Sequence, residues 1–203
     1  MFADPFDVTG RPRVEPASGG STISRSRVPD LLGEWTAATL SRFFGGQAAG
    51  SPDSQRRQLL QRVESHFRPQ LSRLRNPFLP LAMGNPTARA RETVVYENSD
   101  VMVVLPKFDP NTQKVLVVPK QAMLFPTEAS GALMKKLNET AAAVSDAFSA
   151  VAGSGQSRFF IATPDGMELS HMHIHVVPTL GPTAPTGQAL WAQMGRELKQ
   201  RLG

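Results

Sequence analysis

Three of the four histidines of this chain occupy every second position of one short apolar segment, His171-Met-His-Ile-His-Val-Val-Pro178. Successive side chains of a β-strand point to opposite faces, and alternate positions are about 7 Å apart. The spacing therefore predicts a strand over residues 169–178 with one row of imidazoles, formed by His171, His173 and His175. Such a row is suited to metal ligation or to nucleophilic and acid–base chemistry.

A metal site is one hypothesis for this row, because two neighbouring imidazoles can bind one ion with nitrogens near 2 Å. All three converge poorly from a straight strand, since the outer two are about 14 Å apart. The chain has no cysteine, and the remaining histidine, His66, lies far upstream. We therefore expect no metal and no cofactor, while metal-dependent hydrolysis, with Glu168 as a further ligand, stays an alternative. A third interpretation is a row of structural histidines on a half-exposed strand.

Length and composition indicate one globular domain with an extension. The chain has 203 residues, of which 40% are apolar, with 16 Gly and 17 Pro. The absence of cysteine excludes disulfides and a thiol nucleophile. The first residues show neither the basic start nor the apolar stretch of a secretory signal, and no apolar run reaches the length of a membrane span. We expect a cytoplasmic protein without a membrane span.

The positive charge is concentrated in the first half of the chain. Residues 1–91 contain 13 Arg, no Lys and 7 acidic residues, whereas residues 92–203 carry a net charge of −1. This asymmetry predicts an acidic partner for the Arg-rich N-terminal region, or a solvated arginine face. Residues 1–28 are rich in Pro, Gly, Ser and Arg and are predicted to be a disordered arm. One hypothesis for this arm is an address for secretion into another cell without a Sec signal, as an effector.

The remaining pattern predicts an α+β fold, in which a long helix packs on an antiparallel sheet and an N-terminal helical extension precedes the sheet. We expect the helical extension at 29–75 and the catalytic domain at 76–203. The expected helices cover residues 30–44, 52–67, 127–152 and 186–202, and the strands before the histidine strand cover 92–97, 100–105, 114–119 and 157–162. Residues 76–80 are expected to form an extended connector.

The histidine segment, together with the strand–helix–strand unit before it, resembles the histidine triad (HIT) superfamily of nucleotide hydrolases and transferases. Val115-Leu-Val-Val-Pro-Lys120 is similar to a characteristic strand of that superfamily, and Val94–Val104 to its opening hairpin. The short segments Asn76-Pro-Phe-Leu-Pro80 and Leu105-Pro-Lys-Phe108 are similar to its diadenosine tetraphosphate phosphorylase branch. The resemblance covers residues 76–178 and implies the HIT-like α+β fold, with a possible homodimer.

The resemblance implies that His173 attacks the α-phosphorus of a nucleotide or nucleotide conjugate and forms a covalent nucleotidyl-histidine. His171 and His175 would hold phosphate oxygens and orient the nucleophile, without a metal. This activity is that of a phosphoramidase, a pyrophosphohydrolase or a nucleotidyltransferase.

Further residues are expected to bind the nucleotide. Lys114 stands where the superfamily has an imidazole, so it supplies a cation to phosphate or is a solvated lysine. Lys107 faces the pocket or lies on the surface. Gly166 serves a loop that needs positive φ or a close approach to phosphate, or forms a plain turn. Ser170 is the candidate replacement for a missing hydroxyl.

The chain also departs from the superfamily pattern. Met167 and Glu168 stand where Gln and Ser are usual before the triad, and Ala162 or Thr163 stands where Asn is expected. A carboxylate at position 168 repels phosphate unless it is protonated or paired. The alternative function is therefore a nucleotide-binding interaction protein with a degenerate site.

Overall fold

The computed structural model of the chain describes residues 30–48, 51–91, 93–105, 114–153, 157–179 and 187–203. The predicted disordered arm at 1–28 and the predicted nucleotide-binding residue Lys107 lie outside this part. Within it, none of the helices combines the length and the apolar character needed to cross a membrane.

A single antiparallel sheet forms the centre of the fold, with the strand order β1-β2-β3-β5-β4. The strands are β1 (Thr93–Glu97), β2 (Val101–Leu105), β3 (Val115–Pro119), β4 (Ser157–Ile161) and β5 (Ile174–Pro178). The predicted hairpin is formed by β1 and β2. The α+β class and the antiparallel sheet are confirmed.

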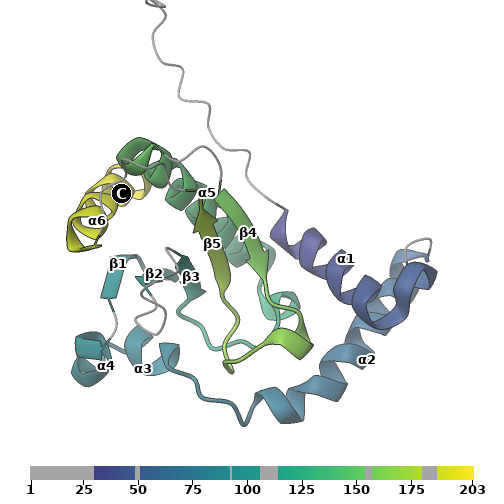
Figure 1. The fold of residues 1–203 in the computed structure, drawn as a ribbon. Helices are drawn as coiled ribbons and strands as arrows, with labels where there is room; N and C mark the ends of the chain where they lie inside the picture. Colours follow the sequence, from purple (N-terminus) through teal and green to yellow (C-terminus); the bar gives the residue numbers. More distant parts are fainter. Residues whose placement is uncertain (1–29, 49–50, 92, 106–113, 154–156, 180–186) are drawn as a thin grey trace, which may run out of the picture.

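Two helices cover one face of this sheet, α5 (Gly131–Ala152) and α6 (Gly187–Leu202) (Figure 1). Alternate strand residues point into this layer and are buried against α5. They are Val101, Val103, Val115, Val117, Ile174 and Val176. Helix α5 begins four residues later than the predicted residue 127, because the hydroxyl of Ser130 accepts from the backbone N–H of Leu133 at 3.2 Å and caps the helix there.

Two short helices lie on the opposite face, α3 (Phe78–Ala82) and α4 (Pro86–Arg91) (Figure 1). The buried side chains of this layer are Phe78, Leu81, Met102, Val104, Leu116 and Val118. The expected extended connector at 76–80 is therefore wrong. The side-chain oxygen of Asn76 accepts from the N–H groups of Phe78 and Leu79, at 3.1 and 3.0 Å, and so starts a helix. Pro80 is tolerated in this first turn, where its missing N–H costs nothing.

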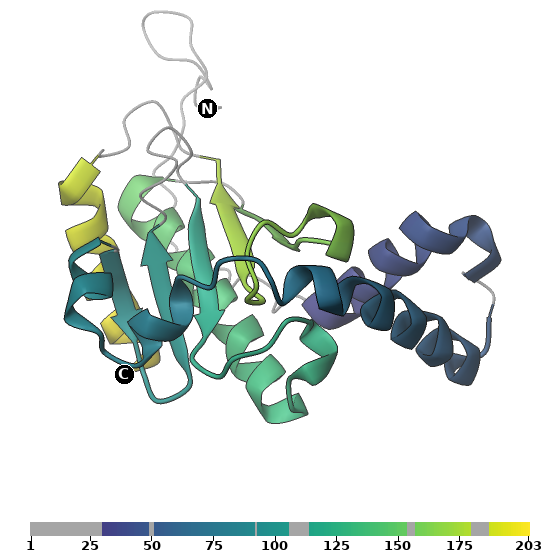
Figure 2. The ribbon, with the colours of Figure 1, turned by 90° about the horizontal axis from the view of Figure 1, so that it is seen from below.

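The two N-terminal helices, α1 (Leu31–Phe44) and α2 (Asp53–Leu71), extend together to one side of the sheet (Figure 2). The carboxylate of Asp30 caps α1 by accepting from the N–H of Gly33 at 3.1 Å. Helix α2 continues beyond the predicted residue 67, with Pro69 inside its last turn. Both helices lie within the predicted extension at 29–75.

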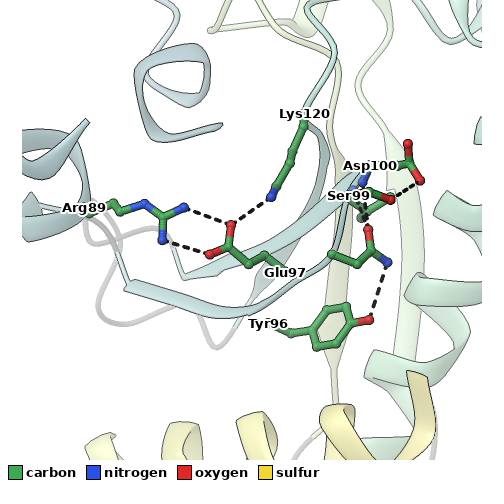
Figure 3. A network of polar contacts seen from close by, with 8 residues as sticks. Arg89, Tyr96, Glu97, Ser99, Asp100 and Lys120 are labelled. Atoms are coloured by element: carbon green, nitrogen blue, oxygen red, sulfur yellow. Dashed lines mark hydrogen bonds and ion pairs between the residues drawn. The ribbon is translucent and has the colours of Figure 1, made fainter. Parts of the chain in front are cut away.

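A polar network fixes the turn between β1 and β2 (Figure 3). The side-chain oxygen of Asn98 accepts from two backbone N–H groups of the turn, each at 2.9 Å. Glu97 is bound by Arg89 at 2.8 Å and by Lys120 at 2.9 Å. These hydrogen bonds lower the pKa of Glu97 to about 2. Lys120, which directly follows β3, is thus paired with the carboxylate of Glu97 at the end of β1.

Candidate active site

The histidine segment is only partly a strand. Strand β5 begins at Ile174, so His175 lies in the sheet while His171 and His173 precede it. The predicted strand over residues 169–178 is therefore wrong at its start. Before Ile174 the backbone bonds to loops instead of a neighbouring strand, since Ser170 N–H donates to Arg75 O at 3.1 Å and Met172 N–H to Met123 O at 2.8 Å.

The three imidazoles also differ in their surroundings. The rings of His173 and His175 are close, with 4.7 Å between centroids and 53° between planes. His171 is fully buried beside them and does not line the cavity described below.

Both ring nitrogens of His171 are engaged. Nε2 lies 2.9 Å from the carbonyl oxygen of Pro119, which can only accept, so Nε2 carries a proton. Nδ1 lies 3.2 Å from the side-chain amide nitrogen of Asn76, which donates to it. Burial lowers the pKa of His171 and keeps the ring neutral. The structure therefore gives this ring an orienting position and leaves neither nitrogen for a phosphate oxygen.

His173 is oriented by the backbone beside it. Its Nδ1 donates to the carbonyl oxygen of His171 at 2.8 Å, so the lone pair of the ring is on Nε2. The side chain is 7% exposed, and this burial is the main reason that its pKa is lowered from 6.5. An imidazole that is neutral at pH 7, with Nε2 unprotonated, is a competent nucleophile.

A cavity of about 610 Å³ opens beside His173 and His175, within the range of small-molecule sites. Its wall combines two cations, one carboxylate and apolar surface. The remaining lining residues are Arg75, Lys114, Leu116, Phe160, Ala162, Gly166, Glu168 and Leu169. The two cations can stabilise phosphate charge, and Leu116 and Phe160 offer an apolar surface to a base or sugar.

His175 is a further strongly perturbed titratable group of this cavity. Burial, followed by the nearby His173 and the charge of Lys114, lowers its pKa to about 3. The ring is consequently neutral at pH 7. Its Nδ1 is buried and has no hydrogen-bond partner in the described part of the chain.

Only some of the residues that were expected to bind the nucleotide line the cavity. Lys114 and Gly166 line the cavity, whereas Ser170 does not. Among the described glycines, positive φ occurs only at Gly45, Gly84 and Gly153. The expectation of positive φ at Gly166 is therefore wrong. Its N–H donates to Thr163 O at 2.8 Å, which is the plain turn given as the alternative.

The region that contains the three histidines matches a known protein family. The model of the HIT domain matches residues 87–181. This segment is a HIT domain. The histidine triad superfamily, to which it belongs, comprises nucleotide hydrolases and transferases, and the resemblance noted in the sequence is confirmed.

Several solved structures are similar to the chain. A HIT-like protein involved in cell-cycle regulation from Bartonella henselae is 16% identical, over 63% of this chain and 96% of that protein, with a TM-score of 0.48. A zinc-bound histidine triad family protein from Mycobacterium smegmatis is 16% identical, over 62% and 94%, with a TM-score of 0.49. A uridylyltransferase is 15% identical, over 72% and 51%, with a TM-score of 0.48. No curated protein matches the sequence.

Residues before the HIT domain complete its site. Arg75 lines the cavity, and Asn76 donates to His171 and, at 3.3 Å, to the carbonyl of Ser170. The sequence pattern predicts no site role for either residue. Their one signal in the sequence is Asn76-Pro77, which by itself predicts part of a connector.

Helix α1 also supports the loop between β4 and the triad of the HIT domain. The indole N–H of Trp35 donates to Ala162 O at 3.1 Å, and Arg42 pairs with Asp165 at 2.8 Å. Trp35 is 2% exposed, so its ring also packs in the core. Both contacts hold the loop that carries Gly166 and Glu168.

No group of three or more histidine, cysteine, aspartate or glutamate side chains within the described ranges is arranged to hold a metal ion. Metal-dependent hydrolysis stays the alternative function, and the sensitivity of turnover to EDTA distinguishes it from catalysis without a metal.

Proposed function

We propose that the protein is a nucleotide hydrolase or nucleotidyltransferase in which His173 attacks an α-phosphorus and forms a covalent nucleotidyl-histidine. The observation that carries the proposal is the orientation of His173. Its Nδ1 is bound to a carbonyl oxygen at 2.8 Å, which leaves the Nε2 lone pair free, and the ring lines a cavity that also holds Lys114 and Arg75.

In the first step, Nε2 of His173 bonds to phosphorus while the bond between phosphorus and the leaving group breaks. The leaving group takes the bonding electron pair. Nδ1–H stays bonded to the carbonyl of His171, which stabilises the positive charge that forms on the ring. Lys114 and Arg75 offset the negative charge on the phosphate oxygens.

In the second step, the oxygen of water or of another hydroxyl or phosphate compound bonds to phosphorus while the bond to Nε2 breaks. The electron pair of that bond returns to Nε2, and the proton of the attacking group is released to solvent. Splitting the displacement in this way replaces one difficult step by two easier ones. Water as the acceptor gives a hydrolase, and a hydroxyl or phosphate compound gives a transferase.

The test is to incubate the protein with adenosine phosphoramidate and with diadenosine tetraphosphate, with and without EDTA. We expect EDTA-resistant turnover and, after an acid-free quench, a protein mass increased by one nucleotide monophosphate. Both should be absent in His173→Ala. The matched control is His66→Ala, since His66 is exposed on α2 and contacts Phe67 instead of the cavity.

A second candidate function is a nucleotide-binding protein without turnover. Two departures from the superfamily pattern favour it. Glu168, which lines the cavity, stands where the superfamily has a Ser that is credited with assisting the leaving group, and Ala162 or Thr163 stands where it has Asn. Binding of both nucleotides without adduct or turnover would support this candidate. Turnover abolished by EDTA would favour the metal-dependent alternative instead.

A further inference from the structure

We propose that Asn76, which precedes the HIT domain, is a positioning residue that orients the nucleophile His173 through the ring of His171. The proposal rests on the proposed function. It assigns a part in the reaction to the linker between the helical extension and the HIT domain.

The orientation of the Asn76 amide is fixed by the start of α3. Its oxygen accepts from the backbone N–H groups of Phe78 and Leu79, at 3.1 and 3.0 Å. A backbone N–H can only donate, so the oxygen and not the nitrogen of the amide must face these two groups. The amide NH₂ consequently faces the histidine segment, where it lies 3.3 Å from Ser170 O and 3.2 Å from Nδ1 of His171.

This orientation permits one tautomer of His171. With the proton on Nε2, the ring donates to Pro119 O and accepts from Asn76. With the proton on Nδ1, two donors would face each other at Asn76 and two acceptors at Pro119. Both clashes would lie inside the protein, because His171 is fully buried. Asn76 and Pro119 thus hold the ring in one tautomer and one orientation, and burial lowers its pKa.

The nucleophile depends on the same segment. Nδ1–H of His173 donates to the carbonyl oxygen of His171 at 2.8 Å, so the placement of that carbonyl sets the direction of Nε2. The rings of His171 and His173 both contact the ring of Phe78, at centroid distances of 5.7 and 5.5 Å. Asn76 is therefore hydrogen-bonded both to His171 and to the backbone of Phe78, whose ring contacts His171 and His173.

The variant that isolates this role is Asn76→Asp. The carboxylate keeps an oxygen for the N–H groups of Phe78 and Leu79, so the helix cap is retained. Its second oxygen now faces Nδ1 of His171 and cannot donate. We expect His171 to take up a proton at Nδ1 and to become an imidazolium, which ¹⁵N NMR of the ring nitrogens detects.

We expect the rate of nucleotidyl-histidine formation in Asn76→Asp to fall at least about tenfold, with KM little changed, because the group that orients the nucleophile has changed its charge and hydrogen bonding. The pH profile of this step should change as His171 titrates. Asn85→Asp is the matched control, since Asn85 caps α4 by accepting from the N–H of Ala88 at 3.1 Å. Its rate and the His171 spectrum should equal those of the unmodified protein.

An unchanged His171 spectrum in Asn76→Asp, or a spectrum of the unmodified protein with the proton on Nδ1, would overturn the inference. So would an unchanged rate of adduct formation in a protein that forms the adduct. If the unmodified protein forms no adduct with either nucleotide, the proposed function fails and the role in catalysis fails with it. The His171 spectrum then still decides whether Asn76 sets the tautomer.

Discussion

The imidazole of His175 stacks face to face on the phenyl ring of Phe160, with 4.5 Å between the ring centroids and 4° between the planes. Phe160 is 43% exposed and lines the same cavity. The phenyl ring thus shields one face of His175 from water. Because burial is the main cause of the depressed pKa of His175, this stack links an exposed aromatic residue to the charge state of the site.

Replacing Phe160 tests this link. In Phe160→Ser, water reaches the uncovered face of His175, so the pKa of this histidine should rise from about 3 towards its ordinary value of 6.5. The measurement is an NMR titration of the His175 ring protons. Phe160→Leu keeps an apolar cover and should give a smaller shift. Equal titration curves for all three proteins would contradict the prediction.

The same depressed pKa values predict how stability depends on pH. His171, His173 and His175 are neutral in the folded protein, while in the unfolded chain each takes up a proton near pH 6.5. The unfolded state therefore binds more protons below that pH, and the free energy of unfolding should fall as the pH falls from 6.5 towards 3. Urea unfolding at pH 7.5 and 5.0 measures the effect.

His175→Phe provides the comparison for this pH dependence. The variant keeps an aromatic ring but removes one of the titrating groups, so its stability should fall less between pH 7.5 and 5.0. A stability of the unmodified protein that is flat or rises over this interval would contradict neutral, buried histidines.

The carboxylate of Glu168 is predicted to weaken the binding of anionic ligands. Glu168 lines the cavity and acts on His173 by raising its pKa. In Glu168→Ser, the repulsion of phosphate is removed, so the affinity for diadenosine tetraphosphate should rise by roughly three- to tenfold, which corresponds to about 1 kcal/mol. Isothermal titration calorimetry at low ionic strength is the suitable measurement.

Glu139→Ser controls for the change in net charge. Glu139 is exposed on α5, where its carboxylate lies 3.9 Å from Lys135, away from the cavity. Its replacement should leave the affinity unchanged. An equal gain in both variants would mean that overall charge, and not the cavity carboxylate, controls nucleotide binding.

The sequence predicts the sheet better than it predicts the site. Alternating apolar residues and the turn at Asn98 locate β1 and β2, because strand pairing across a short turn is set by neighbouring residues. The same alternation places His171 in a strand, but Ser170 bonds to Arg75 and His171 to Pro119, both distant in the sequence, and these contacts hold the segment outside the sheet.

The sequence pattern also fails to predict the helix at residues 78–82, because the start of this helix depends on contacts between distant residues. Its prolines suggest an extended segment, whereas its start is fixed by the side chain of Asn76. That side chain is held in turn by His171, 95 positions later. Such pairings between distant residues leave no periodicity in the sequence, so Asn76 and Arg75 become visible as site residues only in the folded chain.

Trp35 is predicted to hold the loop after β4 by a hydrogen bond as well as by packing. Its indole N–H donates to Ala162 O at 3.1 Å, and its ring lies 6.5 Å from that of Phe125. Trp35→Phe keeps an aromatic ring but leaves the Ala162 carbonyl without this donor, which should lower the free energy of unfolding by about 1–2 kcal/mol. Trp35→Ala also opens a cavity, so its cost should be about 3–5 kcal/mol.

The effect of Trp35→Phe should be concentrated in the loop that carries Gly166 and Glu168. Hydrogen exchange of the backbone amides at 163–168 is expected to accelerate, while exchange in the hairpin of β1 and β2 stays the same after correction for global stability. The control is Trp191→Phe, since Trp191 packs on Phe148 at a centroid distance of 6.1 Å, on the α5 side of the sheet. Faster exchange of the loop in both variants would show that α1 does not hold this loop specifically.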